Sequence, residues 1–144
     1  MKFYLLLYSL ILLISSTSIA DESVFITCKC KHFYWKDNQE LKGTSCDDWA
    51  SPELNRQNYE IKFNEDGKFG FVLAGQSIYV FEGNKKTNLI RAVNVPKPEV
   101  YDLDPSHRSE LLIDRNNATL LWTMTSDTSY FRLDQNCKKS EKLF

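Results

Sequence analysis

The residues of this chain whose types and spacing could most directly carry chemistry are Cys28, Cys30 and His32. On an extended strand these three side chains share one face, and with Cys46 they could offer sulfur and imidazole ligands to zinc or copper(I). The competing interpretation is that the thiols are oxidised to disulfides. Disulfides are favoured because the chain begins like an exported protein and has an even number of cysteines, namely four. We therefore predict neither a metal site nor a cofactor.

The disulfide candidates are Cys28, Cys30, Cys46 and Cys137, and four cysteines allow three pairings. A bond between Cys28 and Cys30 would be strained, because the two residues lie two apart on one predicted strand. We expect one of these two to bond to Cys46 and the other to Cys137, and the spacing does not decide which. A bond to Cys137 would fasten the last predicted strand to the first.

A second polar group lies in the connection from Pro96 to Ser109. Asp102 and Asp104 have the spacing that opens a calcium loop, but the sixth position, which requires glycine, is His107 and the twelfth is Ile113. We interpret the group as a solvated acidic loop. Long connections in compact domains often carry function, so a site is expected here first.

Catalytic patterns are weak along the whole sequence. Only His32 and His107 could act as the base for a serine or cysteine nucleophile. No serine stands in a G-x-S-x-G turn, no glycine-rich loop could hold a phosphate, and no pair of carboxylates is singled out. The sequence therefore favours a protein without catalytic activity.

Aromatic residues are concentrated from His32 to Trp35, with Trp49 not far away. They either pack in the core, which is the favoured interpretation, or form an exposed patch that binds a sugar, a peptide or another protein. The residues from which we expect a binding surface to be built are Trp35, Trp49, Tyr101, Asp102, Asp104 and His107.

The first twenty residues predict export. One cation, Lys2, precedes an apolar block that ends at Ile14, and the small residues Ser18 and Ala20 suit cleavage before Asp21. The apolar block is short for a membrane span. We therefore interpret residues 1–20 as a signal peptide and expect a secreted or periplasmic protein with no membrane span after its removal.

The remaining 124 residues (144 minus 20) have the length of one domain. The signal contains one lysine and no acid, so 17 basic residues remain against 19 acidic ones, a net charge of minus two. A protein that binds nucleic acid by neutralising phosphates has a basic excess, so we expect no nucleic-acid partner.

Period-two alternation of apolar residues predicts a chain made almost entirely of strands. The expected strands are 23–31, 59–63, 69–73, 78–81, 89–95, 110–114, 119–125 and 130–137. Residues 37–56 are polar and are expected to form a loop held by a disulfide, and Gly67 should close the turn after the second strand.

About eight strands in serial hairpins predict an antiparallel meander in a single domain, residues 21–137, followed by a flexible tail, residues 138–144. We expect this all-β domain to close into a small barrel, because closure removes the free edges; a two-sheet sandwich is the alternative.

Size, balanced charge and the lack of catalytic patterns favour an exported, non-enzymatic binding or interaction module, whose partner is a protein or a small ligand. The alternative is an inhibitor of a secreted hydrolase that inserts residues 96–109 into the enzyme. A small hydrolase is the third, less favoured interpretation.

Overall fold

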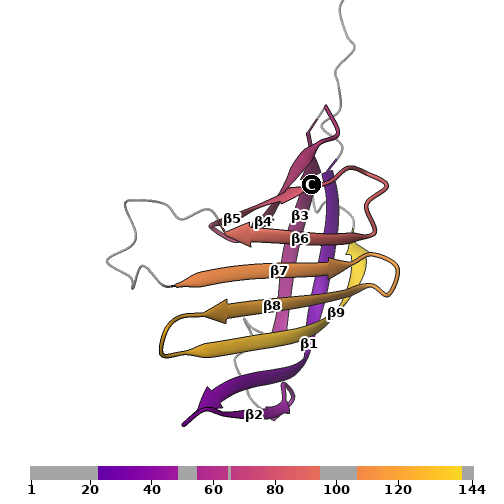
Figure 1. The fold of residues 1–144 in the computed structure, drawn as a ribbon. Helices are drawn as coiled ribbons and strands as arrows, with labels where there is room; N and C mark the ends of the chain where they lie inside the picture. The colour runs from indigo at the N-terminus through magenta and orange to yellow at the C-terminus, as the bar shows by residue number, and fades with distance from the viewer. Residues whose placement is uncertain (1–22, 49–54, 65, 95–106, 141–144) are drawn as a thin grey trace, which may run out of the picture.

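The computed structural model describes residues 23–48, 55–64, 66–94 and 107–140 (Figure 1). They form β1 (Ser23–Asp37), β2 (Glu40–Ser45), β3 (Arg56–Phe63), β4 (Phe69–Ala74), β5 (Ser77–Glu82), β6 (Leu89–Asn94), β7 (Arg108–Asp114), β8 (Thr119–Thr125) and β9 (Tyr130–Ser140). All pairings between these strands are antiparallel, which confirms the predicted all-β fold. None of the described residues belongs to a helix long and apolar enough to cross a membrane.

Eight of the strands close into a barrel. From β3 to β9 each strand pairs with the next one in sequence, β1 pairs with β3, and β9 returns to pair with β1. Figure 1 shows β1 and β3 running across the back of β6–β9, so the two groups of strands enclose the space between them. The predicted barrel, and not the sandwich, is the architecture of this chain.

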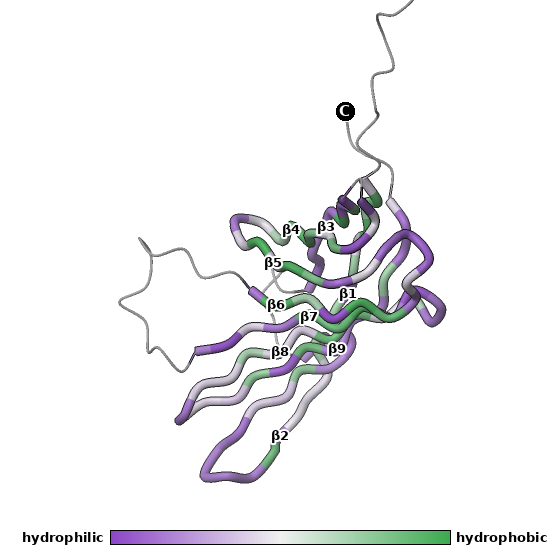
Figure 2. The backbone as a smooth tube through the Cα atoms, turned by 45° about the horizontal axis from the view of Figure 1, so that its top comes forward, coloured by the Kyte–Doolittle hydropathy of each residue, from purple (hydrophilic) through white to green (hydrophobic). Residues whose placement is uncertain are grey.

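The strand outside the barrel, β2, corrects the prediction of a loop over residues 37–56. It pairs with the second half of β1 through a two-residue turn at Asn38 and Gln39, whose φ angles of 47° and 69° are those of a type I′ hairpin. The strand was missed because its sequence, ELKGTS, has no apolar alternation. In Figure 2 its tube is largely hydrophilic.

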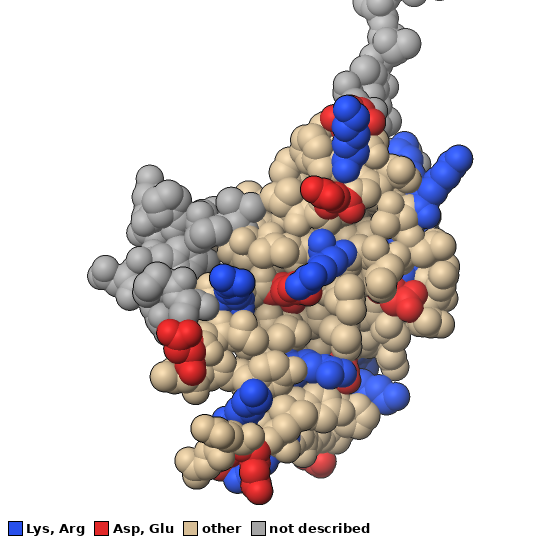
Figure 3. Space-filling model, viewed as in Figure 1, with Lys and Arg blue, Asp and Glu red and all other residues tan. Residues whose placement is uncertain are grey.

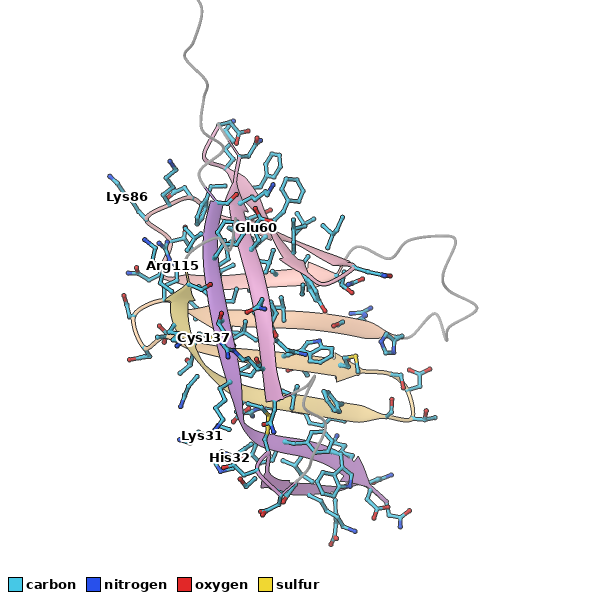
Figure 4. The ribbon with its side chains drawn as sticks, turned by 180° about the vertical axis from the view of Figure 1, so that it is seen from behind. Lys31, His32, Glu60, Lys86, Arg115 and Cys137 are labelled. Atoms are coloured by element: carbon cyan, nitrogen blue, oxygen red, sulfur yellow. A yellow bond between two sulfur atoms is a disulfide. The ribbon has the colours of Figure 1, made fainter. Side chains whose placement is uncertain are left out.

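A β-bulge in β1 explains why the alternation is lost after Cys30. The residues opposite Cys30 and His32 are the consecutive β9 residues Gln135 and Asp134, so Lys31 is an extra residue in β1. The side chains that point inward are therefore shifted by one residue after Lys31: Cys28 and Cys30 point inward before the bulge, and Phe33 does so after it. Figure 4 shows Lys31 and His32 where β1 bends away from β3.

Inward residues from all eight barrel strands fill the core. The main cluster consists of Cys28, Tyr59, Ile61, Val72, Tyr79, Phe81, Ile90, Ala92, Leu111, Ile113 and Leu120. A second cluster, formed by Cys30, Phe33, Cys46 and Leu133, extends the core along the second half of β1. The half-buried Trp122 packs against both clusters and joins them.

Two glycines have positions that no other residue could fill without a change in the backbone or its neighbours. Gly67 has a φ of 66° and closes the β3–β4 turn, as predicted. At Gly70 an added Cβ would overlap the ring of Phe81 and the carbonyl oxygen of Lys62. Glycine at this position lets the Phe81 ring lie against β4.

The last strand is longer than predicted. β9 continues to Ser140, which pairs with Phe25 of β1, so residues 138–140 of the predicted tail belong to the barrel. They were assigned to the tail because the two charged residues Lys138 and Lys139 end the apolar alternation. Residues 141–144 and the predicted signal peptide, residues 1–20, lie outside the described residues.

Candidate functional site

All four cysteines form disulfides, in the arrangement that the sequence favoured. Cys28 bonds to Cys137, and Cys30 bonds to Cys46. The sulfur atoms that a Cys-x-Cys-x-His metal site would need are used in these bonds. Among the described residues, no group of three or more histidines, cysteines and carboxylates could hold a metal ion.

The candidate site is a pocket of about 470 Å³ at the end of the barrel where β3 begins and β4 turns into β5. We call it the mouth pocket. Its lining consists of Arg56, Gln57, Asn58, Tyr59, Ala74, Gly75, Ser77, Tyr79, Leu111 and Trp122. Arg56, Asn58 and Gly75 are exposed and form the rim, so the pocket is open to solvent. Its size lies within the range of about 300 to 1,000 Å³ that is typical of small-molecule sites.

One hydrogen-bonded group that supports the pocket lining is centred on Ser109, which is buried at the start of β7. The indole Nε1–H of Trp122 donates to Ser109 Oγ over 2.8 Å, and the Tyr79 hydroxyl lies 2.9 Å from the same oxygen. The three residues come from β8, β7 and β5. Their hydrogen bonds fix the orientation of the Tyr79 and Trp122 rings, which form walls of the pocket.

A second group is centred on Gln135, which is only 2% exposed although its side chain is polar. Its amide nitrogen donates to the Tyr59 hydroxyl (3.1 Å) and to Gln57 Oε1 (3.2 Å), and the Tyr59 hydroxyl donates to the same Gln57 oxygen. Desolvation by burial raises the pKa of Tyr59 well above its ordinary value of 10.0, so this hydroxyl stays protonated.

Gln57 presents a donor to the pocket. Its carbonyl oxygen accepts hydrogen bonds from Tyr59 and Gln135, whereas its amide nitrogen has no hydrogen-bond partner in the described part of the chain. Half-buried Gln57 belongs to the pocket lining. The amide group can therefore donate to an acceptor on a bound molecule without giving up an internal bond.

A smaller cavity of about 300 Å³ lies at the opposite end of the barrel. Its walls include Val24, Ile26 and Ile113, and Lys138 and Lys139 belong to its lining. Its described lining residues include no buried side chain that makes a hydrogen bond. The mouth pocket, in contrast, is lined by the buried, hydrogen-bonded side chains of Tyr59 and Tyr79. The mouth pocket is therefore the better candidate for specific recognition.

The structure locates two of the six predicted surface residues. Trp35 is half-buried and stacks on Phe33 with ring centroids 5.1 Å apart, so it packs against the second core cluster, as the favoured interpretation held. His107 is half-buried and directly precedes β7, two residues before Ser109. Trp49, Tyr101, Asp102 and Asp104 lie outside the described residues, as does most of the connection in which we first expected a site.

Trp35 belongs to the same end of the barrel as the mouth pocket. It lies opposite Phe131 on β9, Phe131 lies opposite Met124 on β8, and Met124 lies opposite Ser109 on β7. This row of inward positions continues the aromatic wall beyond Trp122, whose ring makes an edge contact with Phe131 at 5.4 Å. The predicted Trp35 and the pocket residues thus share one inner surface.

Sequence reasoning missed the lining residues Gln57, Tyr59, Tyr79 and Trp122, and it missed Ser109 and Gln135, which hold them by hydrogen bonds. The available signal was a polar residue in an inward register. Gln135 stands between the inward positions Leu133 and Cys137, and Ser109 precedes Leu111 in the same register. Such a residue needs a partner inside the barrel, and this points to an internal polar group.

Comparisons with protein-family models, with curated proteins and with solved structures found no match for this chain.

Proposed function

We propose that the chain is an exported, non-enzymatic binding module that holds a small ring-containing molecule in the mouth pocket. The observation that carries the proposal is the combination of aromatic walls with two hydrogen-bonded polar groups at one open end of a closed barrel. Small-molecule sites are built in this way, mostly from apolar and aromatic surface with a few well-placed polar groups, and the mouths of β-barrels are frequent locations for them.

The chemistry of the pocket favours a ligand without a deeply buried charge. Arg56, on the exposed rim, is the only charged residue among the described lining residues. A charged group placed deep inside would lose its hydration without an ionic partner, which is costly. The rings of Tyr59, Tyr79 and Trp122 favour contact with a flat ring, and Gln57 can donate a hydrogen bond to an acceptor on it.

The internal bonding of the pocket supports binding over catalysis. Ser109 has a buried hydroxyl next to the pocket lining, and its partners are the Tyr79 hydroxyl and the Trp122 indole. A serine nucleophile needs a histidine, a carboxylate or a similar base to take its proton. The Ser109 hydroxyl therefore serves to position the rings of Tyr79 and Trp122 in the pocket wall.

The disulfides and the composition of the first twenty residues support export as part of the same proposal. Two disulfides are compatible with such a compartment. Residues 1–20 have the composition of a signal peptide, and we propose that they direct the chain to the periplasm or the exterior. The alternative of a hydrolase inhibitor rested on residues 96–109, most of which lie outside the described residues, and no described contact favours it.

The proposal is tested with the full chain produced in a secretory compartment, with both disulfides formed. Indole, phenol, glucose and N-acetylglucosamine serve as aromatic and sugar probes. A probe that binds raises the melting temperature, since a ligand at about 100 times its Kd adds about 2.7 kcal/mol to the free energy of unfolding. Tryptophan fluorescence should change in the same titration, because Trp122 forms part of the pocket.

Two variants locate the binding. Ala74→Phe places a phenyl ring in the pocket, since Ala74 is an inward lining residue of β4. Thr123→Phe adds the same ring to β8 in the register opposite to Trp122, on the outer face. We expect Ala74→Phe to abolish the response and Thr123→Phe to keep it. The proposal fails if none of the four probes binds, or if Ala74→Phe binds as well as the wild type.

A further inference from the structure

The cavity of about 300 Å³ at the opposite end of the barrel from the mouth pocket differs from that pocket in its chemistry. We call it the far cavity. Its described lining residues include none of those that line the mouth pocket, and none of them is aromatic. The far cavity is therefore a separate site, and the kind of molecule that fits it follows from its own lining.

The inner wall of the far cavity is aliphatic. Ile61 on β3 and Ile113 on β7 are 2% and 3% exposed, and both belong to the main core cluster. Val24 and Ile26 on β1 are half-buried and pack against the same cluster. A hydrocarbon chain placed here would bury apolar surface, and no buried polar group of the described lining would lose a partner.

Three cations lie at the border of this aliphatic wall: Arg115 in the β7–β8 turn, and Lys138 and Lys139 near the end of β9. All three are exposed. The described lining contains one carboxylate, Asp114, so two positive charges are in excess. Figure 3 shows, in contrast, charges of both signs interspersed over the face formed by β6–β9. The border of the far cavity therefore favours an anionic group.

The neighbouring contacts leave the two lysines available for such a group. Asp114 accepts hydrogen bonds from the Asn116 and Asn117 backbone and from the Asn117 side-chain amide, all within its own turn. Arg115 donates through Nη1 to the carbonyl oxygens of Lys85 (2.7 Å) and Thr87 (3.0 Å), which fixes its position. In the described part of the chain, neither Lys138 nor Lys139 forms an ion pair.

Lys139 is the cation best placed to meet a ligand in the far cavity. Leu133, Gln135 and Cys137 are inward positions of β9, and Lys139 continues this register directly opposite Ile26. Figure 4 labels Cys137 where β9 runs beside β1. A lysine at an apolar border extends its aliphatic stem along the wall and keeps its ammonium group in water. The Lys139 charge is therefore expected at the rim, above the aliphatic wall.

We propose that the far cavity binds an amphiphile with one hydrocarbon chain and a carboxylate, of the medium-chain fatty-acid class. The chain lies against Val24, Ile61 and Ile113, and the carboxylate stays at the rim, where Lys138 and Lys139 pair with it and water still hydrates it. A volume of about 300 Å³ is at the lower end of the range for small-molecule sites, which favours a medium chain over a long one. The mouth pocket and the far cavity can be occupied independently.

Isothermal titration calorimetry of the full, disulfide-bonded chain tests the proposal. The probes are decanoate, decanol and decyltrimethylammonium, each used below the concentration at which it forms micelles. They have similar chains and a negative, a neutral and a positive head. Decanoate should bind most tightly and decyltrimethylammonium least. Octanoate should bind roughly fifteenfold more weakly than decanoate, since each buried methylene contributes about a factor of four.

Variants of the exposed lysines test the role of the rim without changing the core. Lys139→Gln should weaken decanoate binding by roughly twofold to fivefold and leave decanol binding unchanged. Lys138→Glu and Lys139→Glu combined should reverse the preference, so that decyltrimethylammonium binds more tightly than decanoate. The matched control is Lys86→Gln, in the β5–β6 turn and outside the cavity lining, which should bind all probes like the wild type. Thermal unfolding of each variant shows that the barrel is intact.

Nuclear magnetic resonance of the nitrogen-15-labelled chain locates the ligand. Decanoate should shift the backbone signals of Ile113 and Ala118 and leave the indole N–H signal of Trp122 in place. Three results would overturn the proposal. The first is a wild type that does not bind decanoate below its micelle concentration. The second is an unchanged preference for decanoate in the folded variant with both lysines reversed. The third is a shift of the Trp122 signal alone, since decanoate would then occupy the mouth pocket.

Discussion

Cys28 on β1 lies directly opposite Cys137 on β9, and the disulfide between them fastens the two strands that close the barrel. The bond joins residues 109 apart in the sequence. The other disulfide, Cys30–Cys46, joins residues only 16 apart and fastens β1 to the end of β2. The two bonds therefore have different structural roles.

Replacing Cys28 and Cys137 together by alanine should lower the free energy of unfolding by about 4 to 5 kcal/mol, because a long loop in the unfolded chain loses its constraint. Replacing Cys30 and Cys46 together should cost less, about 3 kcal/mol. Guanidinium denaturation of the two double variants measures both values. A larger loss for the Cys30–Cys46 pair would contradict the assigned role of Cys28–Cys137 in barrel closure.

Gly70→Ala should destabilise the barrel by about 1 to 3 kcal/mol, because the new methyl group would overlap both the Phe81 ring and the Lys62 carbonyl oxygen. Phe81→Leu shortens the ring but leaves the carbonyl in place, so adding Gly70→Ala to Phe81→Leu should still reduce stability. Urea denaturation of the three variants checks the prediction. Equal stability of the wild type and Gly70→Ala would show that β4 and β3 are not this close.

Because its hydroxyl is buried, Tyr59 should make the free energy of unfolding fall at alkaline pH. Burial raises the pKa of Tyr59 above its ordinary value of 10.0, so the unfolded chain releases this proton at a lower pH than the folded chain does. The Tyr59 contribution is therefore intact below about pH 10 and is lost as the pH rises further, with a slope of at most about 1.4 kcal/mol per pH unit.

Denaturation of the wild type and of Tyr59→Phe between neutral pH and pH 11 isolates this contribution, since the other titrating groups are common to both. The wild type should lose stability more steeply above pH 10. Parallel curves for the two proteins would mean that the Tyr59 hydroxyl is hydrated in the folded state.

Ser109→Ala should cost about 1 to 3 kcal/mol, because the partly buried Trp122 Nε1–H loses its acceptor. The Trp122 ring should also become less well fixed, and this is visible as a change in near-ultraviolet circular dichroism. Ser109→Thr keeps a hydroxyl and should retain most of the signal. An unchanged spectrum in Ser109→Ala would show that the hydrogen bond does not orient the ring.

The sequence predicted the fold well because period-two alternation is a strong signal where one side of a strand is buried. Ile61, Val72 and Phe81 all occupy inward positions in the strands that their spacing predicted. Closure was predictable from Cys137, since a disulfide to the first strand brings the two edges together. The missing strand, β2, has Leu41 as its only large apolar side chain and is held by its hairpin turn and by Cys46, so no apolar alternation could predict it.

The mouth pocket was not predictable because its residues are brought together by register across strands that are distant in sequence. Tyr79, Ser109 and Trp122 meet only after β5, β7 and β8 have taken their places in the barrel. The bulge at Lys31 likewise depends on pairing with β9, and it decides that Trp35 points inward. A single sequence contains no local signal for such contacts.

Nuclear magnetic resonance of the chain labelled with nitrogen-15 tests the central claim, that a ring-containing molecule binds in the mouth pocket, most directly. The probe is whichever of indole, phenol, glucose and N-acetylglucosamine raises the melting temperature most. We predict that it shifts the indole N–H signal of Trp122, identified by its loss in Trp122→Phe, and that Ala74→Phe abolishes the shift. A Trp122 signal that stays in place while the backbone signals of Val80 and Val93, on the outside of β5 and β6, move would contradict the claim.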